Sequence, residues 1–132
     1  MDISIELLRK NPANTRVLKY IESLSAHSDI AEVLLNSVKP LGDVQIYCPD
    51  AQAYRYILVS TNNVIFGVAF GMSALCFRLD PVFKTRAMQT GATDVQELDG
   101  DWVSFERFYH ESDWPKVDSE FWARKAYVYA RG

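Results

Sequence analysis

The spacing of hydrophobic residues changes along the chain, and each change predicts a different element. After Asn11-Pro12, apolar residues recur every three or four positions to about residue 24, which predicts an amphipathic helix capped by Asn11. The same spacing returns after Asp29 and ends at Pro40. We therefore expect either a pair of N-terminal helices or one long helix with a kink.

From Gly42 onward the hydrophobic period becomes two, which is the period of a strand. Strands are predicted over residues 44–48, 54–60, 64–70 and 74–79. Asn62-Asn63 suits a tight turn with positive φ, so the second and third of these strands are expected to form a hairpin.

The predicted strand 64–70 has one face of small residues. Simple alternation places Phe66 on one face and Gly67 with Ala69 on the other. Small side chains let a helix approach a sheet closely. We expect the C-terminal helix to lie there, with Trp122, Ala126 and Tyr129 against Gly67, so that Gly67→Val would overpack the contact.

The second half of the chain begins with another cap followed by proline. Asp80-Pro81 predicts the start of a short helix that stops at Gly91. Asp99-Gly100 then lies between two strand-like runs, residues 95–98 and 102–108, and predicts a hairpin.

Asp118 is the expected cap of a terminal amphipathic helix. The predicted order is therefore α-β(4)-α-β(2)-α. This order defines an α+β fold with a mainly antiparallel sheet of five to six strands, an N-terminal helix or helix pair, a short middle helix and a C-terminal helix. A length of 132 residues fits a single domain over residues 1–132.

Composition agrees with a folded domain, since hydrophobic residues make up 48% and charged residues 23%. The apolar stretches are short and interrupted, and the first residues lack a basic region before an apolar one, so neither a transmembrane helix nor a signal peptide is expected. The two cysteines, Cys48 and Cys76, are too few to staple a small secreted fold. We expect buried thiols, a cytoplasmic location and no membrane association.

Acidic residues are unevenly distributed. The net charge is −3, but residues 94–120 hold nine acidic and two basic residues, a balance of −7 that leaves +4 on the rest. The overall negative charge makes nucleic acid an unfavoured partner without excluding it. The acidic segment either attracts a basic partner or is a solvated face that aids solubility.

Within this segment, residues 102–114 combine aromatic with charged side chains. Alternation in a strand buries only one face, so part of these aromatics is expected on the surface, as in interaction hot spots. The alternative is that they fold over the end of the sheet as core. The predicted interaction surface comprises Asp99, Asp101, Trp102, Phe108, Tyr109, His110, Asp113 and Trp114.

No stretch of the sequence carries a complete catalytic or metal-binding motif. His110-Glu111 with Asp113 lacks a second histidine, and neither cysteine lies in a Cys-x-x-Cys motif. Glycine-rich phosphate loops and Gly-x-Ser-x-Gly are absent from the sequence. We assign no catalytic, cofactor-binding or metal-binding residues and expect no cofactor.

Four stretches of the second half of the chain resemble a known family. They are Phe66-Gly67-Val68-Ala69-Phe70, Leu75-Cys76-Phe77-Arg78-Leu79-Asp80-Pro81, Gly100-Asp101-Trp102-Val103 and Ala126-Tyr127-Val128-Tyr129-Ala130. Over about residues 65–131 the chain resembles the N-terminal domain of TfoX-type competence regulators and the YjbR-like proteins. The resemblance implies a compact α+β domain, also seen in secretion-chaperone-like folds, in small cytoplasmic bacterial proteins that bind other proteins. Some relatives are described as DNA-binding.

These observations favour a non-enzymatic protein-interaction module that is dimeric or bound to a protein partner. The first alternative is a nucleic-acid-binding regulatory module, suggested by the resemblance and by the basic balance outside the acidic segment. The second is a small enzyme whose site joins distant residues such as Cys48, His110 and Asp113.

Overall fold

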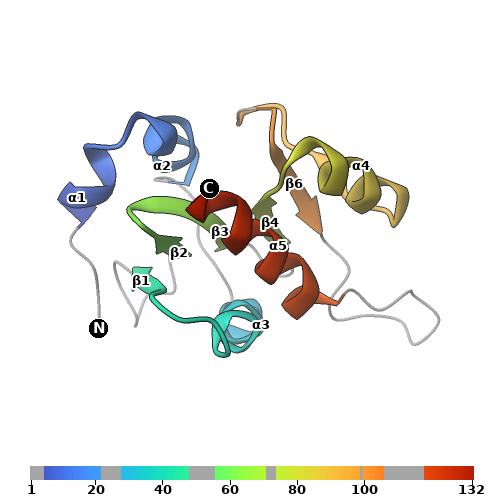
Figure 1. Ribbon diagram of the computed structural model, residues 1–132, viewed down its shortest axis with the longest axis horizontal. Helices are drawn as coiled ribbons and strands as arrows, with labels where there is room; N and C mark the ends of the chain where they lie inside the picture. The colour runs from blue at the N-terminus through green and yellow to red at the C-terminus, as the bar shows by residue number, and fades with distance from the viewer. Residues whose placement is uncertain (1–4, 22–27, 48–55, 71–73, 99, 106–117) are drawn as a thin grey trace.

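The computed structural model describes residues 5–21, 28–47, 56–70, 74–98, 100–105 and 118–132. The helical elements are α1 (Ile5–Arg9), the 3-10 helix η1 (Pro12–Asn14), α2 (Thr15–Ile21), α3 (Ser28–Val38), α4 (Pro81–Gln89) and α5 (Ser119–Arg131). The strands are β1 (Gln45–Tyr47), β2 (Ile57–Thr61), β3 (Val64–Phe70), β4 (Ala74–Arg78), β5 (Thr93–Asp94) and β6 (Trp102–Phe105). Figure 1 shows their arrangement.

The strands form one antiparallel sheet of order β1-β2-β3-β4-β6-β5. The predicted α+β fold, with N-terminal helices, a short middle helix and a C-terminal helix, is confirmed. The segment α1 was not predicted, because its few residues are too short to show a helical period.

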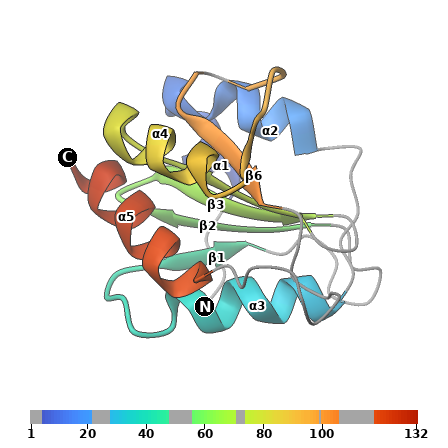
Figure 2. The same cartoon turned by 90° about the vertical axis from the view of Figure 1, so that its right-hand side faces the viewer.

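Helices cover both faces of the sheet. α1 and α2 lie on one side, and α3 and α5 lie on the other (Figure 2). One buried cluster joins α3 and α5 to Phe66 and Phe77, and a second joins α1 and α2 to Ile65 and Trp102. Because both faces are buried, β2 and β4 have no exposed position, and apart from Arg78 at the end of β4 their residues are apolar or small.

Local capping and turn signals in the sequence agree with the structure. The Asp80 side chain accepts from the Phe83 N–H at 2.9 Å, and Asp118 accepts from the Phe121 N–H at 3.0 Å. Asn62 and Asn63 adopt φ of 52° and 60° in the turn between β2 and β3. Each signal depends on residues within one turn, which is why the sequence alone predicts it.

The predicted hairpin is present, since β5 and β6 are antiparallel neighbours, but residues 95–98 are not its first strand. β5 lies earlier than expected, with Thr93 paired to Ser104, and residues 95–98 form a turn closed by a 3.0 Å bond from Leu98 N–H to Val95 O. Val95 and Leu98 are nevertheless buried in the second cluster. Their apolar character is required by the core beneath the turn and not by a strand.

The predicted alternation along β3 is also wrong at Phe66. Val59 pairs with Gly67 but the next residue, Ser60, pairs with Ile65, so Phe66 is an extra residue in a bulge. The bulge turns Phe66 toward the α5 side, where its ring lies 5.8 Å from that of Tyr127.

Gly67 lies on the α5 side of the sheet, as predicted, but the residues that crowd it differ from the expectation. A Cβ built there would lie 2.9 Å from Val59 Cγ2 and 3.2 Å from Phe77 Cε1, both of which belong to neighbouring strands. Trp122 and Ala126 do pack on this side of the sheet, whereas Tyr129 is 37% exposed and lies elsewhere.

Candidate functional site

Most of the interaction surface predicted from the sequence lies outside the described residues. The members outside the described residues are Asp99, Phe108, Tyr109, His110, Asp113 and Trp114. Cys48, named above in the alternative enzyme site, also lies outside them. The surface can be located through its two described members, Asp101 and Trp102.

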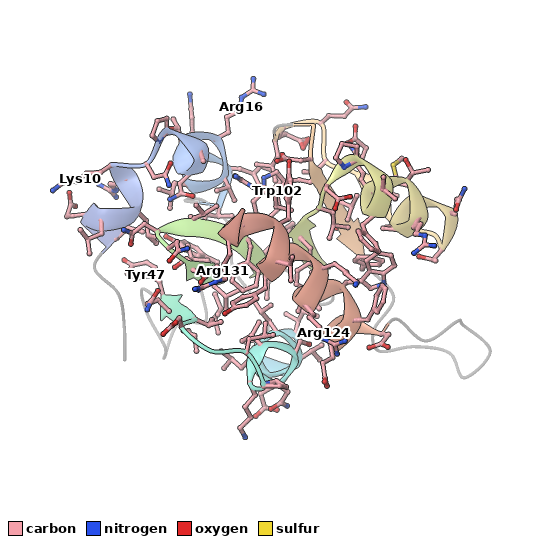
Figure 3. All side chains as sticks on the ribbon, viewed as in Figure 1. Lys10, Arg16, Tyr47, Trp102, Arg124 and Arg131 are labelled. Carbon is pink, nitrogen blue, oxygen red and sulfur yellow. The ribbon has the colours of Figure 1, made fainter. Side chains whose placement is uncertain are left out.

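The prediction that Trp102 forms part of an exposed surface is wrong, because its side chain is 0% exposed. Trp102 begins β6, which lies between β4 and β5, and its ring packs in the cluster beneath the N-terminal helices. Figure 3 shows it toward the centre of the molecule. Phe105 on the same strand is also buried. The expectation of one open sheet face fails because both faces carry helices.

Asp101, by contrast, lies at the wall of a pocket of about 610 Å³. We call this the arginine pocket; its main polar side chains are Arg78, Lys84, Asp101 and Tyr129. They come from β4, α4, the turn before β6, and α5, so the pocket forms where the ends of β4 and α5 meet the start of α4.

Arg78 is held by three contacts on the wall of the pocket. Its Nη2 donates to Ala13 O at 2.6 Å, its guanidinium lies 5.3 Å from the centre of the Trp102 ring, and its Nε lies 3.8 Å from Asp101 Oδ2. The side chain is 9% exposed. A charge so deeply buried is stable only beside an opposite charge and polar partners, which Asp101 and Ala13 supply.

Two further side chains complete this environment. Lys84 Nζ donates to Asp94 Oδ1 at 2.7 Å and to Gly100 O at 2.5 Å. Burial, followed by the negative charge of Asp101, raises the pKa of the Tyr129 hydroxyl, although Arg78 acts in the opposite direction. The Tyr129 hydroxyl therefore keeps its proton, and remains a hydrogen-bond donor, to a higher pH than an ordinary tyrosine does.

A second concave region lies between α3 and the edge strand β1. It has a volume of about 530 Å³, and its apolar lining residues are Leu35, Val38, Leu41, Val44 and Ile46. Glu32 and Lys39 stand at its rim with opposite charges. We call this region the edge groove. Leu35, Leu41, Val44 and Ile46 are only partly buried, so they offer apolar surface to a ligand.

The walls of the edge groove are fixed by contacts from α5. The Tyr127 hydroxyl donates to Gly42 O at 2.5 Å, and Arg131 Nη2 lies 4.0 Å from Asp43 Oδ2. Both contacts hold the loop that leads from α3 into β1. The groove is therefore a preformed feature of the packed helices and sheet.

Sequence reasoning missed the residues that define both regions. Arg78 carries a recognisable signal, because it is the one charged residue at the end of the apolar run 74–79. The sequence pattern places Tyr129 on the core face of its helix and identifies Val44 and Ile46 only as strand positions. Whether such residues leave an open space depends on packing between distant elements.

Metal binding and thiol chemistry have few candidate residues in the described part of the chain. Among them there is no group of three or more His, Cys, Asp or Glu side chains placed to hold a metal ion. Cys76 is buried in the second cluster, as expected. No helix in the described part of the chain is long and apolar enough to cross a membrane.

Comparison with known proteins found no matching family model, no matching curated protein and no matching solved structure. The resemblance to the TfoX N-terminal domain and YjbR-like proteins therefore stays a prediction.

Proposed function

We propose that this protein is a non-enzymatic interaction module that binds an extended segment of a partner protein in the edge groove. The observation that supports this most directly is the position of β1 beside the groove. Within the described residues, β1 has a strand neighbour on one side only, namely β2. An edge strand presents backbone N–H and C=O groups that another extended chain can pair with.

Pairing along the edge of β1 recognises only the backbone of a ligand. The groove adds contacts to the ligand's side chains and so can distinguish one peptide sequence from another. Ile46 lies on the α3 side of the sheet because it pairs with Val59, a residue of the same cluster. A strand added beside β1 would direct every second side chain to that side, toward Leu35 and Val44. The expected ligand is a segment with apolar residues at alternate positions.

Shape disfavours a second copy of this chain as the occupant. A two-fold dimer through β1 would place one edge groove against another, and two concave surfaces meeting across a symmetry axis leave a void. A convex row of side chains from a different protein fills the groove instead. We place this module in the cytoplasm, in agreement with the two-cysteine composition.

The test is selection from a display library of random linear peptides, followed by affinity measurements on the selected sequences. Peptides with alternating apolar residues are expected, and binding should protect the amides of β1 from hydrogen exchange. Val44→Lys introduces a charge into the groove and should weaken binding about tenfold or more. Val82→Lys is the matched control, because Val82 is 67% exposed on α4 and does not line the groove.

Two results would contradict the proposal. The first is a set of selected peptides that bind Val44→Lys and the unaltered protein equally well. The second is a dimer in light scattering that Val44→Lys dissociates, since the occupant of the groove would then be a second copy of the chain.

A second candidate, nucleic-acid binding, has one observation in its favour. Arg9, Lys10, Arg16 and Lys19 are exposed on or beside α1 and α2, and Lys10 and Arg16 point away from the molecule in Figure 3. Binding to a DNA or RNA duplex that falls steeply with added salt would support it. The overall charge of −3 makes this the weaker candidate.

A further inference from the structure

The rim of the edge groove carries opposite charges at its two ends. Glu32, Asn36 and Lys39 follow one another at spacings of four and three residues, which places them in one row along α3 and the residue after it. All three are exposed, and all three line the groove. The row therefore changes from acidic through neutral to basic as it approaches the loop that leads into β1.

Neither charge has a partner in the described part of the protein. The side chains of Glu32 and Lys39 make no hydrogen bond and no ion pair with any described residue. Asp43 is the carboxylate nearest to Lys39 in the sequence, and it lies beside Arg131, with its Oδ2 4.0 Å from Arg131 Nη2. Both rim charges therefore remain available to a ligand in the groove.

The path of the chain fixes which charge lies at which end of β1. After α3, the loop over residues 39–44 reverses the chain, and β1 runs back beside the groove (Figure 2). Lys39 therefore lies toward the start of β1 and Glu32 toward its end. The two residues are about 10 Å apart along the helix axis, because each helical residue advances about 1.5 Å.

We propose that the edge groove selects the direction and the charge order of its ligand. The bound segment runs antiparallel to β1, with a basic residue before its apolar positions, facing Glu32, and an acidic residue after them, facing Lys39. This inference rests on the proposed function and adds the chemistry of the partner to it. From its N-terminal to its C-terminal end, the partner segment is basic, then apolar, then acidic.

The sheet and the rim charges set the direction and the spacing. Every strand pair described in this sheet is antiparallel, and antiparallel pairing is the more stable kind per residue. The same segment in the parallel direction would bring like charges together at both ends of the groove. Positions on one face of a strand are about 7 Å apart, so one or two apolar positions fit between the charged residues within reach of their long side chains.

The test uses two synthetic peptides of identical composition, each with valines at alternate positions. In one peptide a lysine precedes the valines and a glutamate follows them, and in the other the two charged residues are exchanged. Calorimetry at low salt should show about fivefold tighter binding of the lysine-first peptide, because two ion pairs take the place of two like-charge contacts. Added salt should reduce the difference.

The decisive variant exchanges the two rim charges by combining Glu32→Lys with Lys39→Glu. It should reverse the preference, so that the glutamate-first peptide binds about fivefold more tightly. A reversal cannot result from lower stability, which would weaken both peptides alike. The matched control combines Glu97→Lys with Lys10→Glu, at two exposed positions outside the groove, and should keep the original preference.

Three outcomes would overturn this inference while the proposed function stands, provided that Val44→Lys still weakens the binding. They are equal affinities for the two peptides, tighter binding of the glutamate-first peptide to the unaltered protein, and an unchanged preference in the charge-exchanged variant. Failure of both peptides, and of every peptide selected from the library, to bind would instead contradict the proposed function and this inference with it.

Discussion

The edge groove and the arginine pocket differ in whether their charged side chains already have partners. The groove lies at the β1 edge of the sheet, has partly buried apolar walls, and carries Glu32 and Lys39 at its rim with no partner among the described residues. The pocket lies at the ends of β4 and α5, and its Arg78 is paired with Asp101. Charges that are already paired hold the fold together, and charges without a partner can select a ligand. One small fold thus presents two chemically separate regions, and α5 contributes residues to both.

The largest effect that distinguishes the two regions is expected at Asn14, whose side chain holds the N-terminal helices against the sheet. Its Nδ2 donates to Leu8 O and Asn63 O, each at 2.8 Å, and its Oδ1 accepts from Ile65 N–H at 2.9 Å. Asn14→Ala removes all three bonds and leaves buried backbone groups unpaired, at a cost of about 2 to 4 kcal/mol in the free energy of unfolding. Urea denaturation measures this loss.

Asn14 adjoins Ala13, whose carbonyl holds Arg78. Asn14→Ala should therefore loosen the wall of the arginine pocket and leave peptide binding in the edge groove intact. The control is Gln89→Ala, at an exposed position in the last turn of α4, which should change stability little. A loss of peptide binding in Asn14→Ala would mean that the two regions are not independent.

Gly67 tests the packing of the layer formed by α3 and α5 on the other face of the sheet. Gly67→Val drives new atoms against Val59 and Phe77 and is expected to cost about 1 to 3 kcal/mol, which lowers the melting temperature by several degrees. Gly42→Val is the control, because a Cβ at Gly42 meets nothing within 4 Å. Since Gly67 faces α3 and α5, peptide binding in the edge groove should weaken more than it does in Asn14→Ala. Equal melting temperatures for the two variants would show that this face is not closely packed.

A smaller effect is expected at Lys84, which joins α4 to Asp94 and Gly100. Lys84→Met keeps the apolar stem of the side chain and removes both bonds, at a cost of about 1 kcal/mol. Arg124→Met removes the exposed ion pair to Glu120 and serves as the comparison, with an expected change near zero. Thermal unfolding of both variants should show this order, and the reverse order would contradict it.

The smallest expected effect concerns alkaline pH and the Tyr129 hydroxyl. Its folded-state pKa lies above the usual 10.0, so its contribution to stability is present below pH 10.0 and is lost as the pH rises through the folded-state value. Asp101, Arg78 and Asp80 are the charged groups that act on it. Tyr129→Phe should lose less stability above pH 10.0 than the unaltered protein does, as measured by urea titrations across that range. Parallel curves for the two proteins would contradict the assignment.

The sequence predicts features that depend on residues close together in the chain. It does not predict features that depend on residues far apart. Asp80 with Pro81 and Asn62 with Asn63 act within one turn, and both were interpreted correctly. The bulge at Phe66 depends on the partner strand β2, and no pattern inside β3 reveals it. Local chemistry is visible in the sequence, whereas register is a property of two strands together.

The same limit applies to the candidate sites. Asp101 was predicted as a surface residue, but its role at the arginine pocket depends on Arg78 and Tyr129, which the sequence places far away. Trp102 has the aromatic character of an interface residue and is core, because composition does not tell how many helical layers cover a sheet. The edge groove is the space between α3 and β1. It depends on how these two elements pack together, and the sequence pattern of neither element indicates it.

The buried amide of Asn14 also makes one backbone proton a reporter of partial opening. The Ile65 N–H donates to the side chain of Asn14 in the N-terminal 3-10 helix, 2.9 Å away. When η1 and the adjoining helices separate from the sheet, this proton loses its acceptor and exchanges with solvent while the amides in the middle of β3 remain protected. Its exchange rate thus gives the free energy of undocking the N-terminal helices, separate from that of global unfolding.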